Sequence, residues 1–409
     1  MMNAKCLVGK AAIGGLMLIF LLSGCGAAGK STNGSEPNAD DGKTEETGKG
    51  VIHFPDVNKK DWVTSISKLC VTVDQSYTGL SNLNEPIAEE VEAILERVGV
   101  DTTIGTNPDC QAALNISLEM TPVGEDVMGA AGDCYFDASA KGQAMLSASG
   151  KKDLKLELER SVSTGGSGFT IVNSCPTKLE ANYAAAWANA IAPMFAEWWG
   201  APALVSALGS DYYALSNAAV NQLVKMGSEG TSAIPTLIEM LKDVNPTARS
   251  SAARALGRFG EAASEAVPGL IVAADDPDYS VSSAAIGALG EIGDPRGLPV
   301  LIEALNGNDA FVRSGAAEAI GKMGADAAQA VPDLVNAIDA EDYNVGYSAI
   351  EALGQLGPVA KDAVPALITK LESGDDRFSY WVGQALESIT GQEYGEDASA
   401  WRKWYDGQK

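Results

Sequence analysis

The hydrophobic positions of the C-terminal half recur once per helical hairpin. Prolines stand 33, 33, 31, 33 and 33 residues apart, and each is followed two positions later by leucine and then an aliphatic residue. The prolines are Pro202, Pro235, Pro268, Pro299, Pro332 and Pro365, and a second ladder in the same register is Leu223, Leu256, Leu289, Ile320, Leu353 and Leu386. Proline suits the first turn of a helix, and glycines such as Gly260 and Gly293 mark helix ends. The pattern predicts six helical hairpins, which must stack because one hairpin cannot bury its apolar face alone.

Residues 51–200 show a different pattern, in which strand-like alternation and helical spacing follow one another. The predicted elements are a strand at 67–74, a helix at 85–98, strands at 114–120, 135–146 and 154–162, and a helix from about 178 to 199. Pro193 is expected to kink the last helix. The order β-α-β-β-β-α predicts a small α+β domain with one parallel crossover and antiparallel additions.

One repeat carries a specific family resemblance. The run Ala285-Ile286-Gly287-Ala288-Leu289-Gly290-Glu291-Ile292-Gly293-Asp294-Pro295-Arg296 resembles the HEAT-like repeat named after phycobilisome lyases. The resemblance implies an α-solenoid of HEAT-like hairpins over residues 201 to about 397, preceded by the small α+β domain. Its acidic-turn and arginine pair is present as Asp243 with Arg249 and as Asp309 with Arg313. Ser282, Gly346 and Ser379 stand at the arginine position of other repeats, so a continuous ladder of salt bridges is not expected.

HEAT-like arrays mostly bind proteins along a concave surface lined by their second helices, and the resemblance implies the same here. Positions six and two before the ladder leucine are four apart and share one helix face. The candidate partner-binding residues are Asn217, Asn221, Ser250, Arg254, Ser283, Ser314, Glu318, Tyr347, Glu351, Tyr380 and Gln384. The face is polar in the first repeats and acidic and aromatic in the last ones. Aromatic residues suit an interface anchor, and the alternative is that all of these are ordinary exposed helix residues.

The N-terminal residues have the features of a targeting segment. Lys5 and Lys10 precede twelve apolar residues at 11–22, too few to cross a bilayer of about 30 Å. The run ends in Leu22-Ser23-Gly24-Cys25, which resembles the bacterial lipobox. The resemblance implies a signal peptide at 1–24 and a lipid on Cys25, followed by a polar tether to residue 50. The alternative is an ordinary secretory signal with a chance cysteine. An aspartate directly after the lipidated cysteine would mark retention in the inner membrane, and this chain has Gly26 there. The resemblance therefore implies that the lipid anchors the protein in the outer membrane if the organism is Gram-negative, with the protein facing the periplasm or the cell surface.

Four further cysteines fall before residue 200, namely Cys70, Cys110, Cys134 and Cys175. An even number in one exported segment predicts two disulfides, and their long spacings do not fit a zinc site. The sequence alone leaves three pairings. Cys70 and Cys110 open two parallel strands, while Cys134 opens the third strand and Cys175 follows the fourth. This layout favours Cys70–Cys110 and Cys134–Cys175.

Charge and histidine content restrict the function. The chain has 29 Lys and Arg against 54 Asp and Glu, a net charge of −25, which argues against nucleic acid as a partner. His53 is the one histidine, and it stands in a polar stretch before any clear core element. Ser-His-Asp triads and multi-histidine metal sites are therefore excluded unless His53 itself takes part. Asp275, Asp276 and Asp278 lack the calcium-loop pattern, and turn or cap chemistry is the favoured explanation for them. We expect no enzyme activity, cofactor or metal.

Together these features predict five segments: a signal peptide at 1–24, a lipidated cysteine and tether at 25–50, a disulfide-containing α+β domain at 51–200, six HEAT-like repeats at 201–397 and a C-terminal cap at 398–409. Trp401 and Trp404 are expected to cover the last repeat, with a sugar-binding platform as the alternative. The favoured function is a membrane-anchored envelope scaffold that binds a protein through the solenoid. The alternative is an envelope lipoprotein whose 51–200 domain binds a lipid or glycan.

Overall fold

The computed structural model describes residues 63, 66–77, 87–128, 134–149, 151–162, 175–210 and 212–408. The predicted leader, Cys25, the tether and His53 lie outside these residues. No helix within the described ranges is long and apolar enough to cross a membrane.

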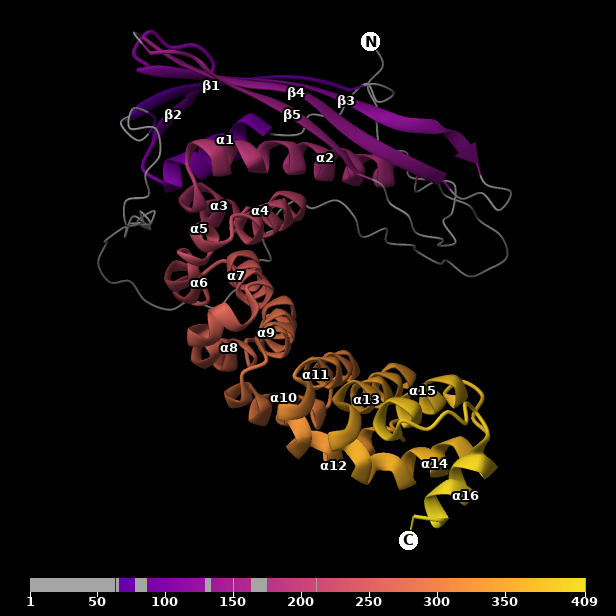
Figure 1. Ribbon diagram of the computed structural model, residues 1–409. Coiled ribbons are helices and arrows are strands. Elements are labelled where there is room, and N and C mark those ends of the chain that lie inside the picture. The colour runs from indigo at the N-terminus through magenta and orange to yellow at the C-terminus, as the bar shows by residue number, and fades with distance from the viewer. Residues whose placement is uncertain are drawn as a thin grey trace, which may run out of the picture. The chain divides into compact units, whose positions relative to one another are not determined.

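The first part of the described chain is a five-stranded sheet covered by two helices on one face (Figure 1). Its strands are β1 (Lys68–Tyr77), β2 (Asp101–Ile104), β3 (Ala112–Met128), β4 (Cys134–Ala148) and β5 (Leu154–Val162), in the order β2-β1-β3-β4-β5. β1 pairs in parallel with β2 and β3, and the remaining pairs are antiparallel. The helices α1 (Ile87–Arg97) and α2 (Cys175–Trp198) face the buried side chains of Leu69, Val71 and Leu114. α2 runs through Pro193 as one helix.

The predicted order of this domain was wrong in one respect, because it omitted β2. This edge strand has only four residues, of which Thr102 alone is buried, so it shows no alternation of apolar and polar side chains. Its main-chain pairing with β1, from Lys68 with Asp101 to Val71 with Ile104, defines it instead. Tertiary pairing therefore determines this element, and the local sequence does not.

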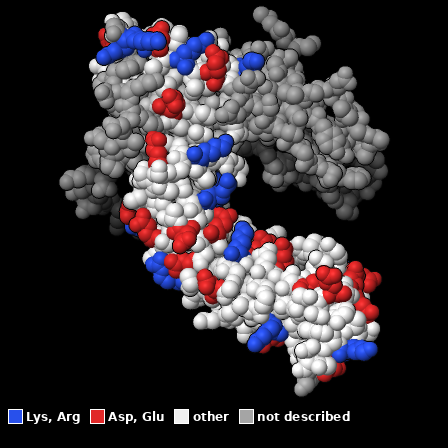
Figure 2. All heavy atoms as spheres, in the orientation of Figure 1, with Lys and Arg blue, Asp and Glu red and all other residues white. Residues whose placement is uncertain are grey.

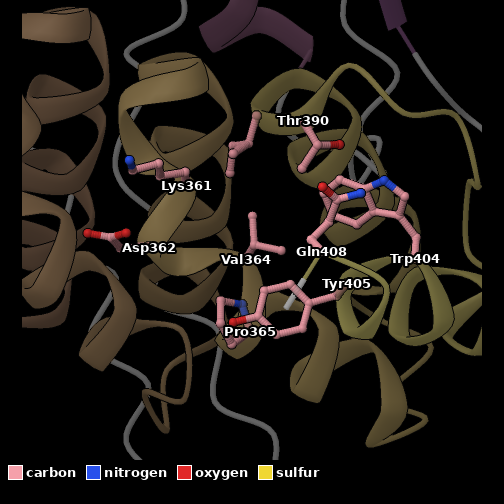
Figure 3. Close-up of a pocket in the computed structure, with 9 residues that line it drawn as sticks. Lys361, Asp362, Val364, Pro365, Thr390, Trp404, Tyr405 and Gln408 are labelled. Carbon is pink, nitrogen blue, oxygen red and sulfur yellow. The ribbon is translucent and has the colours of Figure 1, made fainter.

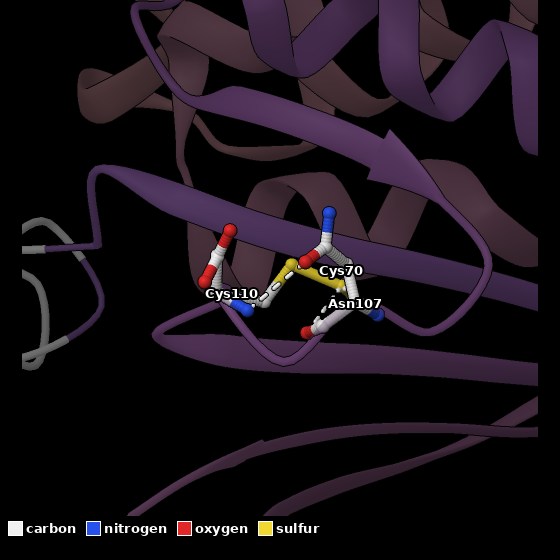
Figure 4. Close-up of a disulfide and its surroundings, with 4 residues drawn as sticks. Cys70, Asn107 and Cys110 are labelled. Carbon is white, nitrogen blue, oxygen red and sulfur yellow. Dashed lines mark hydrogen bonds between the residues drawn. A yellow bond between two sulfur atoms is a disulfide. The ribbon is translucent and has the colours of Figure 1, made fainter.

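A disulfide joins Cys70 to Cys110, as predicted (Figure 4). Residues 105–111 lead from the end of β2 to the start of β3 on the other side of β1. This link is shorter than most connections between parallel strands. The disulfide and a hydrogen bond from the Asn107 N–H to Cys70 Sγ (3.1 Å) hold it against β1.

The second predicted disulfide, Cys134–Cys175, involves side chains that lie outside the described residues. β4 begins at Cys134, and Ala138 pairs with Val162 near the end of β5. The start of β4 and the end of β5 thus lie at the same end of the sheet, as the predicted layout required. The pairing itself stays a prediction.

Six helical hairpins follow the sheet domain and form two layers of helices (Figure 1). The first helices are α3 (Ala201–Ala207), α6 (Ile234–Met240), α8 (Val267–Ala273), α10 (Leu298–Leu305), α12 (Val331–Ala337) and α14 (Val364–Glu372). The second helices are α4 (Tyr213–Lys225), α7 (Pro246–Arg258), α9 (Tyr279–Ile292), α11 (Ala310–Lys322), α13 (Tyr343–Leu356) and α15 (Ser379–Thr390). The segments that link one hairpin to the next include α5 (Ser228–Thr231) and the 3₁₀ turns η2 (Gly260–Ala266), η3 (Pro295–Gly297), η4 (Gly324–Ala330) and η5 (Gly357–Ala363).

Local chemistry sets the ends of these helices. Each first helix has its proline in the first turn, as predicted. The carboxylates of Asp278, Asp309 and Asp342 accept hydrogen bonds from backbone N–H groups at the start of α9, α11 and α13. Gly260 and Gly293 have φ values of 57° and 73° where the second helices end, a conformation that favours glycine. Cap chemistry thus accounts for Asp278, as the sequence favoured.

Successive second helices touch through a ladder of glycine and alanine. A Cβ added at Gly290 would lie 2.5 Å from the Ala319 Cα of the next second helix. The same contact recurs in three other places, with distances of 2.8, 3.0 and 3.2 Å. These pairs are Gly257 with Ala288, Gly321 with Ala352 and Gly354 with Ala385. The backbones of adjacent second helices therefore approach closely, so side chains at the edges of these helices can contact each other.

An ion pair links two neighbouring repeats. The sequence predicted an ion pair of Arg249 with Asp243, but Nη1 of Arg249 donates to the Asp243 and Val244 backbone carbonyls (2.8 and 3.3 Å) and not to the Asp243 carboxylate. Its Nε and Nη2 donate to both carboxylate oxygens of Asp276 in the next repeat, at 2.8 and 2.9 Å. Both side chains are about nine-tenths enclosed, with 14% and 13% of their surface exposed. Arg313 likewise bonds a backbone carbonyl, that of Leu305 (3.1 Å), instead of making the predicted pair with Asp309.

The last helix, α16 (Ala398–Asp406), covers the end of the array. Trp401 is fully buried, and its indole N–H donates to the Gly395 carbonyl (2.8 Å). Arg402 Nε and Nη2 donate to the two carboxylate oxygens of Glu372 on α14, at 2.8 and 2.6 Å. The Trp401 ring consequently offers no exposed face to a sugar.

We expect Gly290→Ala to lower the free energy of unfolding by about 1–3 kcal/mol, because its methyl group would overlap the α11 backbone. Gly287→Ala is the matched control on the same helix, since a Cβ there meets no atom within 4 Å. That change should stabilise by about 0.5–1 kcal/mol through helix propensity. Urea unfolding followed by circular dichroism measures both, and equal shifts of the two variants in one direction would contradict the ladder.

The Arg249–Asp276 pair predicts a pH-dependent stability. The guanidinium hydrogen bond holds the pKa of the Asp276 carboxyl below its usual value. The pair therefore stabilises the fold above about pH 4, and this contribution disappears as the pH falls through the lowered pKa. We expect Asp276→Asn to cost about 1–2 kcal/mol at pH 7 and less near pH 2, because the parent carboxyl becomes protonated as the pH falls. Asp275→Asn removes the same charge from an exposed neighbour and should change little at either pH. A constant cost of Asp276→Asn across this range would rule out the pair as its cause.

Candidate protein-binding face of the second helices

The second helices present one continuous surface, which we call the second-helix face. All eleven residues predicted to bind a partner lie on these helices and are half-buried or exposed. Several of them bond to their own helix: Ser250 Oγ donates to the Thr247 carbonyl, and Ser314 Oγ donates to the Phe311 carbonyl. The predicted positions are therefore accessible, but the structure groups only some of them together.

The first group lies on α4 and α7 and contains Arg254 and Asn221. The Arg254 guanidinium carbon lies 4.8 Å from the centre of the Tyr213 ring, and its Nη1 donates to the Tyr213 hydroxyl (2.9 Å). Arg254 Nη2 also donates to Ser251 Oγ (3.0 Å). Arg258 donates to Asn221 Oδ1 at 3.3 Å. Arg254 and Arg258 of α7 thus both contact side chains of the preceding second helix, α4.

The second group lies at the start of α13 and α15, and we call it the C-terminal aromatic cluster. It consists of Tyr343, Tyr347, Phe378, Tyr380 and Trp381. The ring centre of Tyr347 lies 5.0 Å from that of Trp381 in an edge-on contact, and Tyr380 contacts Trp381 in the same way at 5.0 Å. Tyr343 stacks on Phe378 at 5.0 Å. Such contacts hold large side chains in place at little entropic cost, which suits a binding surface.

Carboxylates flank this cluster. Burial and a hydrogen bond to Glu351 raise the pKa of the Tyr347 hydroxyl, and the charge of Glu318 acts in the same direction. Ser348 Oγ donates to Glu318 Oε1 (3.4 Å), which brings the side chain of Glu318 from α11 to α13. Two predicted acids and one predicted tyrosine therefore meet at one place. Acidic side chains also gather over the C-terminal repeats in the space-filling view (Figure 2).

The prediction missed a row of aromatic residues at the start of the second helices. Tyr213, Tyr279 and Phe311 are 67%, 53% and 69% exposed, and Tyr343 is 38% exposed. The prediction considered positions six and two before the ladder leucine, whereas these residues lie nine or ten before it. A sequence signal was present, because an aromatic residue follows closely after the acidic turn in most repeats.

A cleft of about 420 Å³ opens beside α16 (Figure 3). Its lining includes the rings of Trp404 and Tyr405 together with Lys361 and Asp362. Elsewhere in the described ranges, no three histidine, cysteine or acidic side chains are grouped so that they could hold a metal ion.

Comparisons with known proteins address the repeats. The model of the HEAT repeats family matches residues 201–278, 234–321 and 312–387. An engineered protein is 25% identical, covering 47% of this chain and 96% of its own, with a TM-score of 0.35. The complex of CpcE and CpcF of phycocyanin lyase from Nostoc sp. PCC7120 is 28% identical over 38% of this chain and 98% of its own, with a TM-score of 0.32.

A designed armadillo repeat protein in complex with the peptide (KR)4 is 20% identical, covering 46% of this chain and 98% of its own, with a TM-score of 0.36. No curated protein matches the chain. The family match and the stacked hairpins agree on the same stretch of sequence. Residues 201–387 are therefore HEAT repeats, which form the α-solenoid that follows the small sheet domain.

Proposed function

We propose that this protein is a membrane-anchored envelope lipoprotein that binds another protein through the second-helix face of its HEAT repeats and catalyses no reaction. The HEAT array is of a kind that serves as a protein-interaction scaffold. The lipid anchor and the exported location rest on the lipobox-like run that ends at Cys25.

One observation carries the binding proposal. Among the described side chains, every exposed large aromatic residue lies on a second helix. They are Tyr213, Tyr279, Phe311, Tyr343, Tyr380 and Trp381. The six first helices carry no aromatic residue at all, so the exposed aromatic residues of the array are concentrated in one layer. Aromatic residues that line one layer are typical of a surface that is buried when a partner binds.

The chain is best tested whole, because the first repeat depends on the sheet domain. Arg97 of α1 donates to the Ser206 carbonyl of α3 (3.0 Å), and Ser206 Oγ donates to the Ile94 carbonyl (3.1 Å). Trp187 of α2 also contacts Tyr212 edge-on, with ring centres 6.1 Å apart. A cut at residue 200 would expose these groups.

We expect an affinity pull-down from envelope extract to recover a protein with the full chain. Tyr347→Ala together with Tyr380→Ala should reduce the recovery at least about tenfold, since an aromatic anchor is worth about 2 kcal/mol or more. Val272→Ala is the control, because Val272 is 75% exposed on α8 of the first-helix layer. Equal recovery with the double variant and the parent would place binding elsewhere. Retention of a lipid or glycan without any protein would favour the alternative function of the 51–200 domain.

The anchor has a separate test. Cells that express the full chain and are fed a radiolabelled fatty acid should produce a labelled protein that sediments with membranes. Cys25→Ser should lose the label, because the thiol is the proposed acylation site. Cys6→Ser, a change within the leader, should keep it. Label that persists in Cys25→Ser would overturn the lipoprotein assignment.

A further inference from the structure

The C-terminal aromatic cluster adjoins two carboxylates whose charge no described side chain neutralises. Neither Glu318 nor Glu351 forms an ion pair with a residue in the described ranges. Their hydrogen-bond donors are neutral: Ser348 donates to Glu318, and Gln355 Nε2 (3.2 Å) and the Tyr347 hydroxyl donate to Glu351. Two negative charges thus lie next to exposed rings without a counter-charge from the described residues.

The same cluster already holds cations at its other end. Lys370 Nζ lies 4.7 Å from the centre of the Phe378 ring, and the Arg377 guanidinium carbon lies 5.4 Å from it. Both cations are neutralised, by Asp339 (3.0 Å) and Asp375 (2.8 Å) respectively. These rings therefore bind positive charge within this molecule, as electron-rich ring faces do.

The remaining rings of the cluster differ in what lies over them. No described cation stacks on Tyr347, Tyr380 or Trp381. Tyr380 and Trp381 are 54% and 38% exposed, and Tyr347 is half-buried between Trp381 and Glu351. This part of the surface has the aromatic faces and the negative charge that a cation needs, in a place that solvent reaches.

We propose that the C-terminal aromatic cluster binds a basic segment of the partner protein, with a lysine or arginine side chain over Tyr347 and Trp381 beside Glu318 and Glu351. This inference rests on the proposed protein-binding function and specifies the chemistry of its partner. The ring faces attract the cation, and the carboxylates accept its hydrogen bonds. The net charge of −25 also attracts a basic segment from a distance.

Other occupants fit the surface less well. An acidic or phosphorylated segment would face two unpaired carboxylates at close range, which is repulsive. A wholly apolar segment would remove Glu318 and Glu351 from water without giving them a partner, at a large cost in free energy. In the early repeats Arg254 already lies over Tyr213. A basic segment is therefore expected to bind at the last repeats and not at Tyr213 in the early ones.

The test is fluorescence anisotropy of the full chain with two labelled peptides. One is a twelve-residue Gly/Ser peptide with lysine at every third position, and the other carries glutamine in place of lysine. We expect the lysine peptide to bind at least about tenfold more tightly in low salt, which corresponds to one strong charge-assisted contact. Its Kd should rise with added salt, because screening weakens the attraction.

Variants locate the site. Glu318→Gln combined with Glu351→Gln should weaken the lysine peptide about tenfold, and Trp381→Ala should weaken it several-fold. Glu303→Gln is the matched control, since it removes one exposed charge from α10 in the first-helix layer. Circular dichroism melting checks that each variant is folded. Equal binding of the two peptides, or equal loss in Glu303→Gln, would overturn the inference.

The outcome separates this inference from the function on which it rests. The lysine peptide is tested up to 1 mM, about the weakest Kd expected to matter. If a protein is recovered through Tyr347 and Tyr380 but the peptide does not bind at this concentration, the basic-segment inference fails and the proposed protein-binding function stands. If neither protein nor peptide binds, both fail. Binding of the lysine peptide that depends on Glu318, Glu351 and Trp381 supports the inference.

Discussion

The array depends on the close approach of its second helices. Glycine at the position after the ladder leucine meets alanine of the next helix, and a Cβ at Gly290 would come within 2.5 Å of the Ala319 backbone. A helix pair with larger residues here would be held farther apart. Because the backbones are this close, edge side chains of adjacent helices contact each other, as Tyr347 and Trp381 do. The second-helix face thus owes its contacts between neighbouring helices to the small residues beneath it.

The first interface of the array is built differently. Val224 stands where α7, α9, α11 and α13 have glycine, and a buried hydrogen bond between Ser216 and Ser251 joins α4 to α7. The Arg249–Asp276 pair then ties the second repeat to the third. The first interface therefore has a polar contact in place of the glycine, the second combines the Gly257–Ala288 contact with an ion pair, and the later ones keep the glycine–alanine contact. The carboxylates without a counter-charge, Glu318 and Glu351, belong to the later group.

The sequence predicted the repeats well because each hairpin repeats the same local chemistry: proline in the first turn, an acidic cap and a terminal glycine. Even the irregular spacing of 31 residues has a local cause, since η3 has three residues where η2, η4 and η5 have seven. Non-local choices were harder to predict. The four-residue β2 depends on its pairing with β1, and Arg249 prefers Asp276 of the next repeat over the nearby Asp243 carboxylate. The exposed aromatic row was not predicted because it lies at the first residues of the second helices. The predicted binding positions lie farther along these helices, six and two residues before the ladder leucine.

The proposed function requires that the second-helix face, and not the first-helix layer, contacts the partner. Site-specific photo-crosslinking in living cells tests it most directly, with a benzophenone amino acid placed at Tyr279 or, for comparison, at Val272. Both positions are more than half exposed, on α9 and α8 of the same repeat. We expect a crosslinked adduct from position 279 and none from position 272. An adduct only from position 272 would contradict the account.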